Sequence, residues 1–316
     1  MPLRKIDEDL GIAAQEGSAD KTSELLACGA DPRSRNSAAL RVAAVNGHVE
    51  CIRLLLPVSD AKANGSEALR WAANTGQVEC VRLLLPVSDP MEQESGALRW
   101  AAKEGHAECV KLLLPVSNPK ANRSEALRWA ANNGQVECVR LLLPMSDPME
   151  QESGALRWAA MHGHAECVRL LLPVSDPKAR ESEALRYAAE NGHEECLRLL
   201  LPVSNQKALK FLALRSSARN GHAECVKLLA VSGPRLEIKR ALKEAMAKGD
   251  SKIAALLIGE AAELIDEVDL SKCLAAAVKK KHGDLASYLS SIIEQRELVG
   301  VAPGAAACGG RRHARL

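Results

Sequence analysis

The chain has 316 residues, 47% of them apolar, and its formal net charge at pH 7 is +2. A nearly neutral chain has no overall attraction to nucleic acid or to a membrane surface. It contains no run of 18 apolar residues, and its first residues, Met1–Asp7, lack the apolar core of a signal peptide, so we expect neither a membrane span nor a signal peptide.

Residues 1–36 are interpreted as an N-terminal capping repeat. Leu10 and Gly17 match positions of a pattern that returns later in the chain, while the insert Ser18–Ser23 is polar, as suits an end that faces water. From residue 37 to residue 234 the same pattern recurs seven times at an interval of 29 residues. Such an interval is typical of a stacked repeat array.

Each repeat is predicted to consist of two short helices joined by a tight turn. In the repeat that begins at Ser66, Leu69 and Ala72 have helical spacing, and Gly76 is expected to end the helix in a left-handed conformation. The hydroxyl of Ser66 is expected to cap the start of this helix. A second helix follows, and its apolar stripe consists of Cys80, Val81, Leu84 and Leu85.

A unit of two repeats has been copied within the array, because residues 124–181 nearly duplicate residues 66–123. The predicted core positions are unchanged, and the differences gather at the end of the first helix and in the following loop. The differences include Lys103 against Met161, Glu104 against His162, and Thr75 against Asn133.

The C-terminal part departs from the pattern. Residues 235–296 are interpreted as divergent repeats that close the stack, with Gly249 and Gly283 as the helix-ending glycines. Residues 297–316 are rich in alanine, glycine and arginine and are predicted to form a disordered tail.

The repeats resemble those of the ankyrin family. The run Ala68–Leu85, ALRWAANTGQVECVRLLL, is similar to the family pattern T-P-L-H-x-A-A-x-x-G-H-x-E-V-V-x-L-L-L, and Cys28–Arg35 resembles the family's G-A-D-x-N-A-R linker. The repeat is shorter than the usual length of about 33 residues, and the missing residues fall where the family carries a β-hairpin. The resemblance implies an all-α, ankyrin-type solenoid of stacked helix-turn-helix repeats with shortened hairpin loops.

Aromatic residues recur at one position of the first helices. They are Trp71, Trp100, Trp129, Trp158 and Tyr187, which we call the aromatic ladder. One interpretation is that the rings pack against neighbouring repeats, and the other is that they form a binding stripe. The resemblance places the partner-binding surface on the concave side. The candidate partner-binding residues are Trp71, Asn74, Thr75, Trp100, Lys103, Glu104, Trp129, Asn132, Asn133, Trp158, Met161, His162, Tyr187, Glu190 and Asn191.

Two charged series also recur. The arginines are Arg41, Arg70, Arg99, Arg128, Arg157, Arg186 and Arg215, and the glutamates are Glu50, Glu79, Glu108, Glu137, Glu166, Glu195 and Glu224. Because the two series are equal in number, we expect them to balance each other and to satisfy loop carbonyls.

The repeated cysteines and histidines are predicted to be structural. One cysteine occurs at the same position of each repeat, and helices stacked about 8–10 Å apart are too distant for disulfides between neighbours. Cys-x-x-Cys spacing is absent, and Gln77 and Gln135 replace the histidine in two repeats, which a metal or catalytic role would not tolerate. We therefore expect no catalytic residue, metal or cofactor, and a reducing, cytoplasmic compartment.

The sequence favours a monomeric, non-enzymatic scaffold or adaptor that binds another protein of unknown identity. The alternative is a substrate-recruiting module of an enzyme or effector system, with activity in residues 235–316 or on a partner chain. A nucleic-acid binder is disfavoured by the nearly neutral charge.

Overall fold

The computed structural model describes residues 4–204, 207–230, 235–260 and 267–300. Every regular element in these ranges is a helix, which confirms the expected all-α class. The chain divides into two compact units. The first unit consists of residues 1–188 and 195–205, and the second of residues 189–194 and 206–316.

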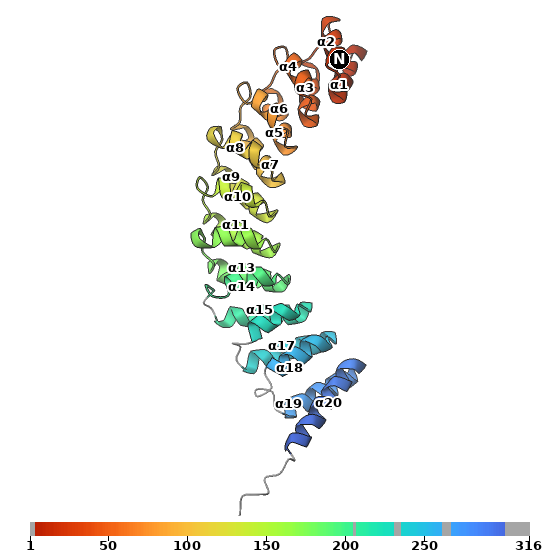
Figure 1. The fold of residues 1–316 in the computed structure, drawn as a ribbon, viewed down its shortest axis with the longest axis vertical. Coiled ribbons are helices and arrows are strands. Elements are labelled where there is room, and N and C mark those ends of the chain that lie inside the picture. Colours follow the sequence, from red (N-terminus) through yellow and green to blue (C-terminus); the bar gives the residue numbers. More distant parts are fainter. Residues whose placement is uncertain (1–3, 205–206, 231–234, 261–266, 301–316) are drawn as a thin grey trace, which may run out of the picture. The chain divides into compact units, whose positions relative to one another are not determined.

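The first unit is a stack of helix pairs, drawn from red to green in Figure 1. The helices are α1 (Lys5–Glu16), α2 (Ala19–Ala27), α3 (Ser34–Asn46), α4 (Val49–Leu55), α5 (Ala63–Asn74), α6 (Val78–Leu84), α7 (Glu92–Glu104), α8 (Ala107–Leu113), α9 (Ala121–Asn132), α10 (Val136–Leu142), α11 (Glu150–Met161), α12 (Ala165–Leu171), α13 (Ala179–Glu190) and α14 (Glu194–Leu200). The last residues of α13 and the first residue of α14 belong to the second unit.

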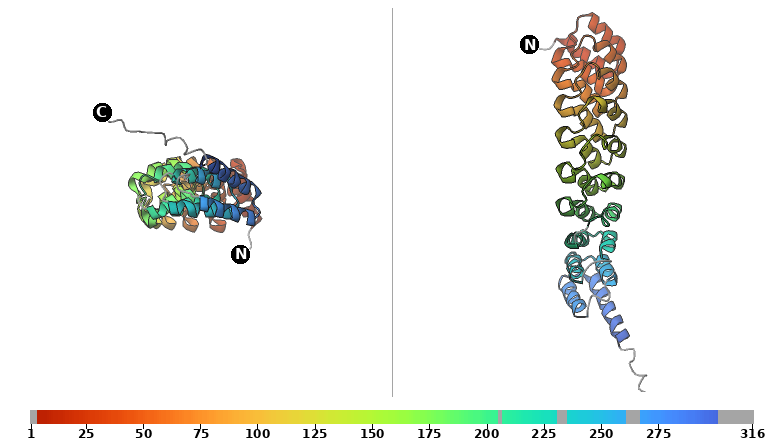
Figure 2. Two further views of the ribbon diagram at one scale, coloured as in Figure 1. Left: turned by 90° about the horizontal axis from the view of Figure 1, so that it is seen from below. Right: turned by 90° about the vertical axis from the view of Figure 1, so that its left-hand side faces the viewer.

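The helices of the first unit form two layers. The first helices of successive repeats, α3, α5, α7, α9 and α11, each contact the next one in the series. The second helices, α4, α6, α8, α10 and α12, do the same, and the layers are visible as two columns in the second view of Figure 2. Each pair is too short to be stable alone, so its stability comes from packing on its neighbours.

The core of the first unit lies between the two layers. Leu69 and Ala72 of α5 and Leu84 of α6 are fully buried, as are their equivalents in the neighbouring repeats. Burial of one leucine side chain contributes about 1.5–3 kcal/mol. Gly76 ends the first helix with φ of +73°, which confirms the left-handed cap that the sequence predicts.

The shortened hairpin is a left-handed turn of three residues at the start of the first helices α3, α5, α7, α9, α11 and α13. In α5 these are Asn64, Gly65 and Ser66, with φ of 52°, 69° and 54°. The same conformation recurs at Arg35–Ser37 and at four later sites, all of them without glycine. Because left-handed backbone costs about 1–2 kcal/mol per non-glycine residue, these turns need support from their surroundings.

The prediction that the repeated serine caps its own helix is wrong. Ser66 lies inside the left-handed turn, and its hydroxyl oxygen accepts the backbone N–H of Asp89, 2.8 Å away in the loop that leads to the next repeat. The side chain of Asp89 in turn accepts the N–H of Met91 at 2.9 Å. The left-handed backbone brings the hydroxyl within reach of this loop, so the serine fixes the connection between its repeat and the next one. Equivalent bonds are made by Ser37, Ser95, Ser124 and Ser153.

The second unit contains three further helix pairs. They are α15 (Lys207–Asn220) with α16 (Ala223–Ala230), α17 (Arg235–Lys248) with α18 (Ser251–Glu260), and α19 (Glu267–Lys279) with α20 (Gly283–Gly300). Helix α17 contacts both α15 and α19, and Leu242 is buried in this packing. The expected division at residues 36, 234 and 296 stays a prediction.

Two details of the C-terminal pattern differ from the sequence interpretation. The left-handed residue before the last helix is Lys281, with φ of +61°, and Gly283 is the first residue of α20. His282 follows Lys281 and packs against Gly249, as histidines do in the regular repeats. Helix α20 also continues to Gly300, four residues into the stretch predicted to be disordered, while residues 301–316 lie outside the described residues.

Candidate partner-binding surface

The aromatic ladder lies on the side of the first helices that faces away from the core. Trp71 follows the buried Leu69 by two residues, which places the ring about 200° around the helix. Trp71 and Trp158 are 42% and 40% exposed, whereas Trp100 and Trp129 are half-buried. The exposed Trp71 and Trp158 therefore lie on either side of a more enclosed central pair, and Tyr187 at the end of the ladder is half-buried as well.

The central pair is a packing contact between neighbouring repeats. The ring centroids of Trp100 and Trp129 are 5.5 Å apart, with an interplanar angle of 59°. The ammonium group of Lys103 lies 4.7 Å from the centroid of Trp100 and 5.8 Å from that of Trp129. A cation over an aromatic face is attracted by the ring quadrupole, so Lys103 ties the two rings together.

The second copy of the two-repeat unit has a different arrangement at the same place. His162, which replaces Glu104, stacks on Trp158 with 6.3 Å between centroids and an angle of 8°. The positions that vary between the copies thus lie against the aromatic ladder in both copies. This is the shared helix face that spacing predicts.

A cavity of about 330 Å³ opens between α5 and α7. It is lined by Glu67, Arg70, Trp71, Asn74, Trp100, Lys103 and Glu104. Lys103 and Glu104 form an exposed ion pair at 3.2 Å on its rim. Its volume is at the lower end of the range for ligand pockets, and it combines two aromatic walls with charged groups.

Glu67 and Arg70 are part of this cavity, although the sequence analysis did not include them. The carboxylate of Glu67 accepts hydrogen bonds from Trp71 Nε1 at 3.2 Å and from Arg41 of the preceding repeat at 3.0 Å. The residue after the repeated serine alternates between glutamate and glycine in successive repeats, for example Glu67 and then Gly96. This alternation in the sequence was the pattern that could have indicated a special role for Glu67.

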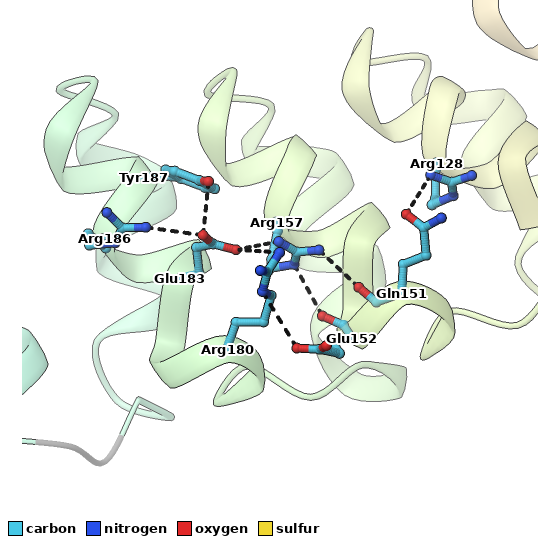
Figure 3. Close-up of polar contacts among 8 residues, drawn as sticks. All are labelled: Arg128, Gln151, Glu152, Arg157, Arg180, Glu183, Arg186 and Tyr187. Carbon is cyan, nitrogen blue, oxygen red and sulfur yellow. Dashed lines mark hydrogen bonds and ion pairs between the residues drawn. The ribbon is translucent and has the colours of Figure 1, made fainter. Parts of the chain in front are cut away.

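Repeats with glutamate after the repeated serine form one type of interface with the preceding repeat, and Glu183 in Figure 3 is an example. Its carboxylate forms an ion pair with Arg157 of the preceding repeat and accepts a hydrogen bond from Tyr187 Oη at 2.9 Å. Burial alone would raise the pKa of Glu183, but the hydrogen bonds from Tyr187 and Arg157 hold it below its usual value. The carboxylate therefore stays charged and fixes the aromatic ring of its own repeat.

The other type of interface uses glutamine. Arg70 donates to Gln93 Oε1 at 2.7 Å, and Arg128 donates to Gln151 Oε1 at 2.8 Å (Figure 3). A Cβ added to Gly96 would lie 3.0 Å from Cδ of Arg70, so the absence of a side chain at position 96 leaves room for the arginine. The two interfaces alternate, which makes the duplicated two-repeat unit a structural unit.

The expected pairing of the repeated arginines with the repeated glutamates is wrong. Glu79 instead pairs with Arg82 on its own helix, at 3.5 Å, with both side chains about 60% exposed. Exposed pairs of this kind contribute about 0–1 kcal/mol. The expected bonding to loop carbonyls is confirmed, since Arg70 donates to the carbonyl oxygens of Gly65 and Asn64 at 3.0 and 2.9 Å. These bonds support the left-handed turn.

Several predicted site residues take part in stacking. Thr75 Oγ1 donates to the carbonyl oxygen of Val45 at 3.0 Å, and Asn133 Nδ2 donates to that of Lys103 at 2.9 Å. Asn132 donates to the side chain of Asn133. Glu190 and Asn191 belong to the second unit, where the carbonyl oxygen of Glu190 accepts hydrogen bonds from Asn220 Nδ2 at 2.8 Å and from His222 Nε2 at 2.9 Å.

The histidines have a structural role in the stack. His164 Nε2 donates to the carbonyl oxygen of Asn132 at 3.0 Å, and its ring covers Gly134 of the preceding repeat. Gln135 reaches the carbonyl oxygen of Lys103 in the same way, at 3.5 Å, which explains why glutamine replaces histidine. Among the described residues no group of three or more potential metal ligands is brought together.

The repeated cysteines are buried free thiols. Cys80, Cys109, Cys138, Cys167, Cys196 and Cys225 each have a pKa raised to about 11, chiefly because burial disfavours the thiolate. A thiol with such a pKa is a weak nucleophile at neutral pH. In the described parts of the chain, no helix has the length and hydropathy needed to cross a membrane.

Comparisons with known proteins agree with this geometry. Residues 10–94, 87–152 and 156–240 match a family model described as ankyrin repeats in three copies, which covers more than half of the chain. No curated protein sequence matches. The solved structures that match include the crystal structure of the human ASB11 ankyrin repeat domain. That structure is 22% identical, has a TM-score of 0.48, and covers 55% of this chain and 95% of its own.

Proposed function

Because the chain belongs to the ankyrin repeat family, we propose that it is a non-enzymatic scaffold that binds another protein through its first-helix surface. Ankyrin repeats generally mediate protein–protein interaction. We define the first-helix surface as Trp71, Asn74, Trp100, Lys103, Glu104, Trp158, Met161 and His162.

The exposure of Trp71 and Trp158 carries the proposal. Each indole leaves about two fifths of its surface open while its backbone is fixed in a packed helix. Tryptophan is favoured as a binding anchor because a large apolar area is buried at little cost in side-chain entropy. A preformed surface also loses little conformational entropy on association.

The experiment begins with capture of binding proteins by the full chain, followed by a measurement of Kd for the captured partner. Replacing Lys103, Glu104, Met161 and His162 together by alanine should weaken binding at least tenfold, which corresponds to about 1.4 kcal/mol. Helicity and thermal stability should change little, because these side chains lie outside the buried core.

A matched control is available on the second helices. Arg82, Arg140 and Arg169 are about half-exposed, and their ion pairs lie within their own helices or on the outer layer. Alanine at these three positions should leave the Kd unchanged. Loss of binding in this control without loss in the first set would place the partner on the opposite layer.

The division of the aromatic ladder gives a further comparison. Trp71→Ala and Trp158→Ala should weaken binding at a smaller cost in stability than Trp100→Ala, because both rings are more exposed, although they lose the hydrogen bond to Glu67 and the stacking on His162. Trp100→Ala should lower stability, because it removes the contact with Trp129 and Lys103. The reverse assignment of effects would contradict the division described above.

We also propose a monomer and a reducing compartment. The free thiols of the repeats support the reducing compartment. Light scattering after size-exclusion chromatography measures the first, and fractionation of cells measures the second. If the captured partner is an enzyme, its activity with and without the chain distinguishes a scaffold from a substrate-recruiting module.

A further inference from the structure

The second unit contains a cavity of about 380 Å³ between α17 and α19. The buried side chains of Leu242 and Met246 form its apolar floor, and the small side chains of Ala247 and Ala276 also line it. The volume lies within the range of sites that bind a small molecule or a bulky side chain. The cavity shares no residue with the first-helix surface.

All charged groups among the described residues that line this cavity have the same sign. They are Lys239, Lys243, Lys272 and Lys280, and none of the described lining residues is a carboxylate. The cavity on the first-helix surface, in contrast, has two carboxylates and two cationic groups. Since the whole chain has a net charge of only +2, the excess of positive charge at α17 and α19 is local.

The carboxylates Glu244 and Glu237 of α17 are held by arginines. Glu244 accepts hydrogen bonds from Arg215 at 3.2 Å and Arg219 at 3.0 Å, on the side that faces α15. Glu237 forms an ion pair with Arg240. Lys243 and Lys272 form no hydrogen bond or ion pair with the described residues. Their ammonium groups are thus available to an anionic partner at the rim.

Leu236 adds one exposed apolar side chain on α17. It lies three residues before Lys239 and seven before Lys243, on the same face of the helix, and it is 57% exposed. A ligand that matches this surface has apolar groups along its centre and negative charges beside them. Among the described residues, no aromatic side chain lines the cavity to stack on a nucleic-acid base.

We propose that this cavity binds an acidic peptide segment of a partner protein, with a bulky apolar side chain on the floor and flanking carboxylates at the lysines. Charge complementarity determines orientation and increases the rate of association, and burial of the apolar side chain supplies affinity. The proposal does not depend on the first-helix surface, so either can fail without the other.

The test uses the full chain and a fluorescein-labelled peptide in which leucines are flanked by aspartates and glutamates. Its binding is followed by fluorescence anisotropy at low and at physiological salt. We expect saturable binding that weakens with salt, at least tenfold weaker binding for Lys243→Glu with Lys272→Glu, and no binding of a peptide whose leucines are replaced by serine. Ala276→Phe, which fills the cavity from an exposed position, should also abolish binding.

The control is Lys227→Glu with Lys252→Glu, which changes the net charge equally at exposed positions outside the cavity. It should bind the peptide as the unmodified chain does, and circular dichroism should show equal helicity for all variants. Equal loss in the control, or equal binding of the serine peptide, would show non-specific charge attraction and overturn the proposal. Binding to phosphatidylserine vesicles without binding to the peptide would identify a lipid surface instead.

Discussion

Replacement of Gly134 by alanine tests the stacking of repeats through a single added methyl group. Gly134 has φ of +70°, and a Cβ at this position would lie 2.5 Å from Nδ1 of His164 in the next repeat. The left-handed backbone costs alanine about 1–2 kcal/mol. Displacement of the imidazole also weakens its hydrogen bond to Asn132, worth about 0.5–1.5 kcal/mol. We therefore expect a loss of about 2–3 kcal/mol of unfolding free energy.

Two other glycines separate these contributions. Gly29 has φ of +86° and no atom within 4 Å of an added Cβ, so Gly29→Ala should cost only the backbone term, about 1–2 kcal/mol. Gly11 lies within α1, lacks a left-handed φ and also has open space, so Gly11→Ala should be neutral or should stabilise by up to about 1 kcal/mol.

The assay is urea unfolding of the full chain, followed by circular dichroism and by tryptophan fluorescence. A stacked array can unfold in parts, so a single free energy is justified only where the two transitions coincide. The variants Gly134→Ala, His164→Ala and both together form a double-mutant cycle. If the two substitutions act together, the double variant should lose less unfolding free energy than the sum of the two single losses. If the losses are simply additive, or if Gly134→Ala costs no more than Gly29→Ala, the histidine contact does not hold the repeats together.

Three further predictions concern the thiols, the buried carboxylate and the core. At pH 8 the repeat cysteines, including Cys138 with a pKa of about 11, should react with Ellman's reagent only after unfolding, whereas the exposed Cys28 should react at once. Rapid reaction of all thiols in the native state would contradict the burial of the repeat cysteines. The pKa of Glu183 is lowered in the folded chain, so its contribution to stability is present above its unfolded pKa of about 4.5 and disappears as the pH falls through the folded pKa. Glu183→Gln should therefore lose stability at pH 7 and show a weaker dependence on acid pH in urea unfolding. An unchanged pH profile would refute this. Leu142 lies in α10, which packs between α8 and α12. Leu142→Ala should cost about 2–5 kcal/mol of unfolding free energy, and more than Leu10→Ala in the terminal helix α1. Denaturant unfolding of the two variants measures this ranking, and the reverse order would show that the stack is not cooperative.

The helix pairs and their buried face were predictable from local patterns. The spacing of Leu69 and Ala72, the stripe around Cys80, and the glycine at position 76 each depend on residues within one helix or one turn. The duplicated two-repeat unit was also evident in the sequence, and it identified Lys103 and Glu104 as positions that differ between the two copies. Repetition strengthens such signals, because each copy reports the same local preference independently.

The partners of the polar side chains were decided by the tertiary structure. Ser66 reaches Asp89, and Arg41 reaches Glu67, across 23 and 26 residues of chain. The Ser66 contact depends on the left-handed turn at Asn64–Ser66, and the equivalent turns of later repeats include residues such as Glu94 and Arg123, whose intrinsic preferences oppose that conformation. No short local pattern indicates such a turn, because contacts from Arg70, farther along the helix, and from the loop at Asp89 stabilise it. Trp71 is exposed while Trp100 is more enclosed, although both occupy the same position of their repeats. The difference arises because Trp100 contacts Trp129 of the next repeat, a contact that the sequence of one repeat does not indicate.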